Sequence, residues 1–147
     1  MTRSTAFGIA LAAVGALAMT AGCGGSSSDS SLTSVTAPSG TLVTDTFTGT
    51  VQPGGLDWKP FTITTGGTIN VTLLAAGPPA TITMGLGVGT PSSSGTCALL
   101  SGASTTAVAS SSAQLNGSLA AGSYCVEVLD LGNAAGPIAY TVTVAHT

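Results

Sequence analysis

Charge is nearly absent from this chain. Its 147 residues include two Lys or Arg, five Asp or Glu and one His, and charged residues make up 5% of the total. Binding to phosphate groups needs a cluster of Lys and Arg, so this composition excludes nucleic acid as a partner and disfavours an anionic membrane surface. The surface is therefore made soluble by Ser, Thr, Asn and Gly.

Residues for catalysis are equally scarce. A catalytic triad needs a base, and the only histidine, His146, lies next to the C-terminus, where we expect the chain to fray. Paired carboxylates, as in glycosidases, need two acids at one cleft. Glu127 and Asp130 are close in sequence, but we expect them to be solvated charges on a nearly neutral surface. The sequence thus predicts a protein that is not an enzyme.

The N-terminal residues have the organisation of a bacterial lipoprotein signal peptide. Arg3 precedes an uncharged apolar run of about 14 residues, 6–19, which matches a signal-peptide core and is shorter than the roughly 20 residues of a membrane span. The run ends at Thr20-Ala21-Gly22-Cys23. Small residues directly before a cysteine resemble a lipobox, in which the cysteine is diacylated and becomes the first mature residue. We expect residues 1–22 to be a signal peptide and Cys23 to carry the lipid.

Two further residues, Thr20 and Gly24, bear on how the signal peptide is cleaved and on which membrane the protein reaches. A lipobox usually has Leu three residues before the cysteine, where this chain has Thr20, so an ordinary signal-peptidase cut after Ala18 is the alternative. In a cell with an outer membrane, Gly24 lacks the inner-membrane retention signal that Asp would supply there, so we expect the outer membrane. Removing Arg3 leaves Lys59 as the only strong cation and changes the formal net charge from −3 to −4.

Residues 23–40 are expected to be a tether. The segment is rich in Gly and Ser, has no apolar period, and behaves as a flexible coil that spans roughly 20 to 25 Å. Residues 41–147 have the usual length of one domain.

Apolar and polar residues alternate through most of this domain. Apolar side chains take every second position in six segments, and turn signals rich in Gly, Pro and Asn separate them. The segments are 46–51, 61–64, 69–73, 81–88, 124–128 and 140–144, and one of the turn signals is Asn116-Gly117. The pattern predicts an all-β fold, a single antiparallel β-sandwich of about seven or eight strands. Pro60 is expected at the start of its strand or on an edge strand.

Three runs of the domain resemble the bacterial pre-peptidase C-terminal domain. They are FTGTVQPGGLDWKPFTITTGGTINVTL (47–73), LAAGSYCVEV (119–128) and GPIAYTVTV (136–144). The family has a strand, a Gly-rich turn with Asp and an aromatic residue, a later aGtY strand and a closing Y-t-l-x-v strand. The resemblance covers nearly all of residues 43–145 and implies a jelly-roll-like sandwich. It also implies a role in secretion or substrate adhesion, although we expect this domain to stand alone on its tether.

Cys97 and Cys125 remain when Cys23 carries the lipid. In an exported chain two such cysteines indicate a disulfide. Closing a loop of about 27 residues stabilises by about 3.5 kcal/mol in the chain-entropy model. Two free buried thiols are the alternative. Cys125 alternates with Tyr124 and Val126, so we expect the bridge on the outer face of its sheet or at a sheet edge.

Trp58, Asp57 and Asp130 are the candidate ligand-binding residues. Trp58 falls on the parity opposite Phe61 and Ile63, so it either stacks on a sugar ring or covers the end of the sandwich near the turn. Asp57 and Asp130 offer the hard oxygen ligands that Ca²⁺ prefers, and the alternative for Asp57 is capping of the Gly-rich turn. No other cofactor is expected.

These observations predict an exported, lipid-anchored, non-enzymatic β-sandwich module with a structural or binding role at the cell envelope. The alternative is a carbohydrate-binding module that uses Trp58, with Ca²⁺ as an assisting ion. The expected partners are the membrane, through the N-terminal lipid, and a polysaccharide or a surface protein.

Overall fold

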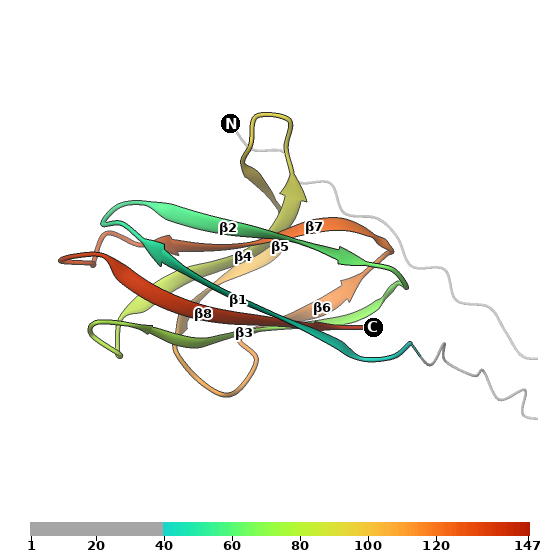
Figure 1. The fold of residues 1–147 in the computed structure, drawn as a ribbon, viewed down its shortest axis with the longest axis horizontal. Coiled ribbons are helices and arrows are strands. Elements are labelled where there is room, and N and C mark those ends of the chain that lie inside the picture. The colour runs from blue at the N-terminus through green and yellow to red at the C-terminus, as the bar shows by residue number, and fades with distance from the viewer. Residues whose placement is uncertain (1–39) are drawn as a thin grey trace, which may run out of the picture. The chain divides into compact units, whose positions relative to one another are not determined.

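A computed structural model describes residues 40–147, which form eight strands (Figure 1). The predicted signal peptide, Cys23 and nearly all of the tether lie outside these residues. The strands are β1 (Val43–Val51), β2 (Leu56–Ile63), β3 (Gly67–Gly77), β4 (Thr83–Pro91), β5 (Cys97–Val108), β6 (Leu115–Leu119), β7 (Gly122–Asp130) and β8 (Ile138–His146). Within residues 40–147, no helix has the length and apolar character needed to cross a bilayer.

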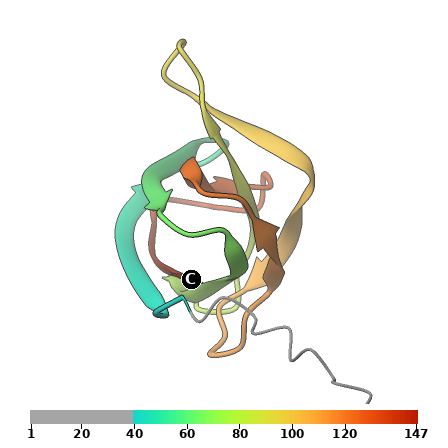
Figure 2. The same ribbon diagram turned by 90° about the vertical axis from the view of Figure 1, so that its right-hand side faces the viewer.

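The strands form two antiparallel sheets of four strands each (Figures 1 and 2). Sheet A has the order β1-β8-β3-β6 and sheet B the order β2-β7-β4-β5. Every connection crosses from one sheet to the other except the hairpin between β4 and β5, which remains in sheet B. This is the arrangement of an eight-stranded jelly roll, and the predicted all-β sandwich is confirmed.

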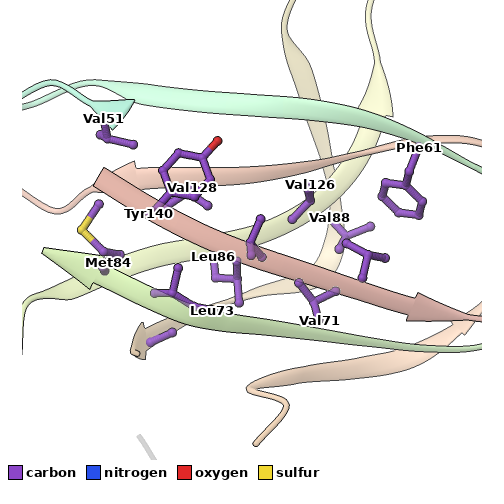
Figure 3. Packing of buried hydrophobic residues seen from close by; sticks show 14 of the residues in the cluster. Val51, Phe61, Val71, Leu73, Met84, Leu86, Val88, Val126, Val128 and Tyr140 are labelled. Carbon is purple, nitrogen blue, oxygen red and sulfur yellow. The ribbon is translucent and has the colours of Figure 1, made fainter. Parts of the chain in front are cut away.

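The core lies between the sheets and follows the predicted alternation (Figure 3). Val71 and Leu73 of sheet A and Leu86 and Val126 of sheet B belong to one cluster of buried side chains and are at most 1% exposed. Burying a Val or Leu side chain stabilises a fold by roughly 1.5 to 3 kcal/mol relative to leaving it exposed. The two inward faces therefore hold the sheets together.

Strands β5 and β6 were not among the six predicted segments. Both are edge strands, and most of their residues are exposed or half-buried on both faces, so their sequences carry little alternation. The turn predicted at Asn116-Gly117 is wrong, because both residues lie within β6 and pair with Asn70 and Ile69 of β3. Pro60 lies on the edge strand β2, as predicted.

Candidate functional site

The outer face of sheet B is built around a strand, β4, whose three central outward positions are glycines. Alternate residues of β4 are buried in the core, so Gly85, Gly87 and Gly89 take its outward positions. A Cβ atom on Gly85 would lie 2.6 Å from Cγ of Leu129, and one on Gly87 would lie 2.7 Å from Cδ2 of Leu99. Side chains from the strands on either side of β4 therefore lie over it.

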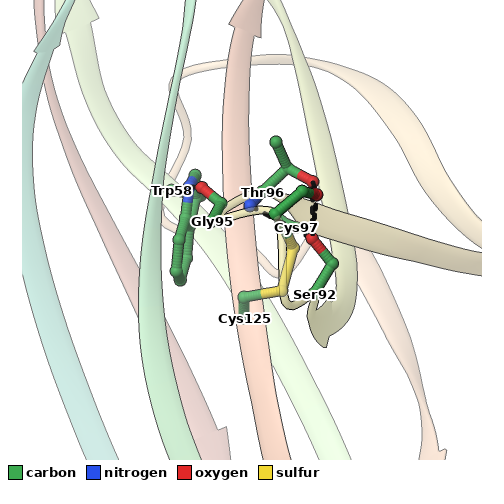
Figure 4. The surroundings of a disulfide bond; sticks show 7 residues. Trp58, Ser92, Gly95, Thr96, Cys97 and Cys125 are labelled. Carbon is green, nitrogen blue, oxygen red and sulfur yellow. Dashed lines mark hydrogen bonds between the residues drawn. A yellow bond between two sulfur atoms is a disulfide. The ribbon is translucent and has the colours of Figure 1, made fainter.

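Cys97 and Cys125 form the predicted disulfide on this face (Figure 4). They belong to β5 and β7, which are not neighbours but flank β4. A Cβ atom on Gly89 would lie 2.9 Å from Sγ of Cys97, so the bridge passes over β4 where that strand has no side chain. The outward position of Cys125 agrees with its predicted parity. It is nevertheless fully buried, so the side chains around it cover this part of the outer face.

Trp58 stands beside the disulfide (Figure 4). It is half-buried and lies directly opposite Glu127 in the pairing of β2 with β7. Its Nε1–H donates a hydrogen bond of 3.2 Å to the carbonyl oxygen of Gly95, in the turn between β4 and β5. The indole thus covers part of the outer face of sheet B, and it ties the hairpin to that face.

Hydroxyl groups gather in the turn of the same hairpin. The Oγ atom of Ser92 lies 2.7 Å from Oγ of Ser94 and 2.8 Å from Oγ1 of Thr96. The backbone N–H of Gly95 donates to the carbonyl oxygen of Ser92 over 3.1 Å. This exposed turn forms a polar rim next to the indole.

Glu127 lies on this face among apolar groups. Its cross-strand neighbours are Trp58 and Gly87, and its neighbours along the same face of β7 are Cys125 and Leu129. The residue is only 6% exposed, and no hydrogen bond or ion pair from residues 40–147 reaches its carboxyl group. Burial raises the pKa of that group above its ordinary value of 4.5. The prediction of a solvated charge is wrong for Glu127.

Asp130 is also buried, so the same prediction is wrong there, but its carboxylate is well partnered. It accepts hydrogen bonds from the backbone N–H groups of Gly54 at 2.7 Å and of Asn133 and Ala134 at 3.1 Å. These hydrogen bonds lower the pKa of Asp130 below its ordinary value of 3.8, and the bond from Gly54 has the largest effect. Because the folded pKa is below the unfolded one, the bonds stabilise the fold above about pH 3.8, and their contribution is lost as the pH falls further.

Asp57 joins the two sheets instead of capping a turn. Its Oδ2 atom accepts a 2.9 Å hydrogen bond from the Tyr140 hydroxyl group, and Nζ of Lys59 lies 3.1 Å from the same oxygen. Burial, and then the bond and the charge of Asp57, raise the pKa of Tyr140 well above its usual range. A Cβ atom on Gly49 would lie 2.7 Å from the Tyr140 ring, so β1 approaches this pair closely.

The two predicted calcium ligands therefore have different partners. Asp57 binds side chains of β2 and β8, whereas Asp130 binds backbone N–H groups of two turns. In the part of the chain that the structure describes, no three His, Cys, Asp or Glu residues are grouped so that they could hold a metal ion. The calcium site stays a prediction.

His146 does not fray, and that prediction is wrong. It is 4% exposed, and its Nε2 atom lies 3.2 Å from Oδ2 of Asp45. Its ring centroid lies 6.0 Å from that of Phe61, and a pocket of about 350 Å³ adjoins all three residues. The signal was in the sequence, because His146 continues the inward parity of Tyr140 and Val144 on β8.

Fold and geometry together define a jelly-roll β-sandwich whose sheet B has a partly buried patch on its outer face. No protein-family model matches the chain, and no curated protein matches it in sequence. The resemblance of residues 43–145 to the pre-peptidase C-terminal domain stays a prediction from the three runs that carry it.

Proposed function

We propose that this protein is an exported, lipid-anchored binding module of the cell envelope, and that its ligand binds to the outer face of sheet B. The composition of that face is the observation that carries the proposal. An antiparallel sheet usually presents polar side chains to water on its outer face. At the centre of this face the buried Glu127 lies opposite Trp58 of β2 and between Cys125 and Leu129 of β7, and Leu99 lies over the neighbouring Gly87. Exposed polar residues border this centre, namely Thr62, Ser104, Thr106 and Ser123. We call the set of Glu127, Trp58, Leu99, Leu129 and the disulfide the Glu127 face.

Two features keep the Glu127 face rigid. The disulfide links β5 to β7 across β4, and the Trp58 indole is bonded to the turn of the β4–β5 hairpin. A site that is ordered before binding loses less conformational entropy when the ligand arrives. The disulfide also supports export, because such bonds persist in oxidising compartments.

Replacing Cys23 by Ser in the full chain is expected to abolish lipid attachment, because the thiol is the group that would be acylated. The expected result is loss of labelled palmitate from the protein and its movement from the membrane fraction to the soluble fraction. Thr20→Leu, which introduces the usual lipobox residue, serves as the control. This variant should keep both the palmitate label and its place in the membrane fraction. A Cys23→Ser protein that stays in the membrane fraction would contradict the anchor.

Carbohydrate is the second candidate ligand, and the position of Trp58 beside the hydroxyl groups of Ser92, Ser94 and Thr96 favours it. Trp58 is the only tryptophan, so its fluorescence reports on this face alone. We expect the mature chain, residues 23–147, to show a saturable change with a specific polysaccharide, tested with and without Ca²⁺. Calorimetry should show the affinity lost in Trp58→Ala and kept in Leu74→Ala, which truncates an exposed apolar residue of sheet A. A flat response to every polysaccharide would exclude this candidate.

A further inference from the structure

We propose that the Glu127 face binds the free ammonium group of an amino sugar, with the carboxylate of Glu127 as its counter-ion. The inference rests on the proposed function, because it names the chemistry of the ligand for the same face.

Among the side-chain carboxylates of residues 40–147, Glu127 is the one that lacks a hydrogen-bond or ion-pair partner. Asp45, Asp57 and Asp130 each have hydrogen-bonding groups within 3.2 Å. No such group from residues 40–147 reaches Glu127, although it is as buried as Asp130. A buried carboxyl group without a donor destabilises a fold, and such groups in native proteins often serve binding. A cationic ligand would supply the missing partner.

The carboxyl group is covered but not sealed. Among residues 40–147, the one side-chain polar atom that is both closed to solvent and without a hydrogen-bond partner is Nδ1 of His146. The oxygens of Glu127 therefore keep some contact with solvent. In this proposal the ammonium group reaches the carboxylate from that side.

An organic ammonium suits these surroundings better than a metal ion. Ca²⁺ takes six to eight oxygen ligands, whereas Glu127 is a single carboxylate among apolar side chains. An ammonium group attached to a carbon ring needs one carboxylate, and the C–H groups of that ring can pack on Leu99 and Leu129. The face of a tryptophan ring also attracts cations. A neutral hydroxyl would leave the charge of Glu127 uncompensated in this setting.

The polar rim indicates that a sugar carries the ammonium group. Ser92, Ser94 and Thr96 place three hydroxyl groups in the exposed turn to which the Trp58 indole is bonded. A sugar ring offers hydroxyl groups to such a rim and a C–H face to the indole. The alkyl stem of a lysine side chain offers no groups to the rim.

The test compares glucosamine oligosaccharides with their N-acetylated counterparts, which have the same backbone but no charge. The mature chain, residues 23–147 with Cys23→Ser, is titrated near neutral pH and followed by Trp58 fluorescence and calorimetry. We expect the free amines to bind at least about tenfold more tightly, since the charge-assisted bond forms only with them. Glu127→Gln should remove this difference. Asp29→Asn, which removes one carboxylate from the tether, should retain it.

Thermal unfolding is the second readout. It shows whether the variant is folded and whether the buried Glu127 carboxylate destabilises the protein without ligand. Burial raises the pKa of Glu127, so the wild-type protein loses stability as the pH rises from about 4.5 through the raised value. Glu127→Gln has no such loss and should unfold at a higher temperature at pH 7. The two proteins should converge below pH 4.5. Glu127→Met, which is uncharged and of similar length, repeats the comparison.

Each other outcome has a definite meaning. Equal affinity for free and N-acetylated oligosaccharides would overturn the ammonium inference and still support a binding module for carbohydrate. Binding of a lysine-containing peptide without binding of glucosamine would overturn the inference that a sugar carries the ammonium group. A flat response to glucosamine would overturn the inference, and the polysaccharide panel would then decide the carbohydrate candidate separately.

Discussion

Replacing both Cys97 and Cys125 with Ala is expected to lower the free energy of unfolding by about 3.5 kcal/mol. The two residues are 28 apart in sequence, and a crosslink over such a loop restricts the unfolded chain by about this amount in the chain-entropy model. For a domain of this size, the midpoint of thermal unfolding should fall by on the order of 15 °C or more. Urea denaturation of the oxidised wild-type and variant proteins measures the difference.

The wild-type protein under reducing conditions is the control for the double variant. It should lose a similar amount of stability, and the emission of Trp58 should change in both, because the indole stands beside the bridge and is bonded to the adjoining turn. A variant as stable as the oxidised protein would show that the strands of sheet B hold the hairpin without help from the bridge.

Gly49→Ala is expected to destabilise the fold by about 3 kcal/mol. The added methyl group would collide with the Asp57 carboxylate and lie 2.7 Å from the Tyr140 ring, so either β1 moves away or the hydrogen bond between Asp57 and Tyr140 breaks. Overpacking a core costs about 1 to 3 kcal/mol, and loss of a hydrogen bond to a charged group costs a similar amount. Thermal and urea unfolding measure the change.

Gly117→Ala is the matched control for Gly49→Ala. Gly117 also lies in an edge strand of sheet A, but a Cβ atom there would meet nothing within 4 Å. We expect a change within about 0.5 kcal/mol. Equal stability of the two variants would contradict the close approach of β1 to Asp57 and Tyr140.

The core could be predicted because its signal is local. Residues such as Val71, Leu86 and Val142 alternate with small or polar residues, and a strand with one buried face requires that pattern. Strands β5 and β6 lack it because most of their residues are exposed or half-buried on both faces, whereas the edge strand β1 keeps an inward-facing alternation. Their positions follow from pairing with β4 and β3, which their own sequences do not encode.

The candidate site could be predicted only in part, for a related reason. Parity placed Trp58 and Cys125 on the outer face, where the structure has them. Parity also placed Glu127 there, but its burial depends on Gly87, 40 positions earlier in the chain, and on the side chain of Leu99 that lies over that glycine. The alternate glycines of β4 were the available sign of a position where neighbouring side chains could bury Glu127. They can be interpreted in this way only when the strands that pair with β4 are known.

The proposed positions of the anchor and of the ligand have a mechanical consequence. The expected tether leads into β1 at Val43, which belongs to sheet A, whereas the proposed ligand binds to sheet B. A force applied between the ligand and the membrane would act on the contacts between the two sheets. The Asp57–Tyr140 hydrogen bond is one of these contacts. The domain would then resist tension through its interior packing, and the contacts between the sheets would set the force at which it opens.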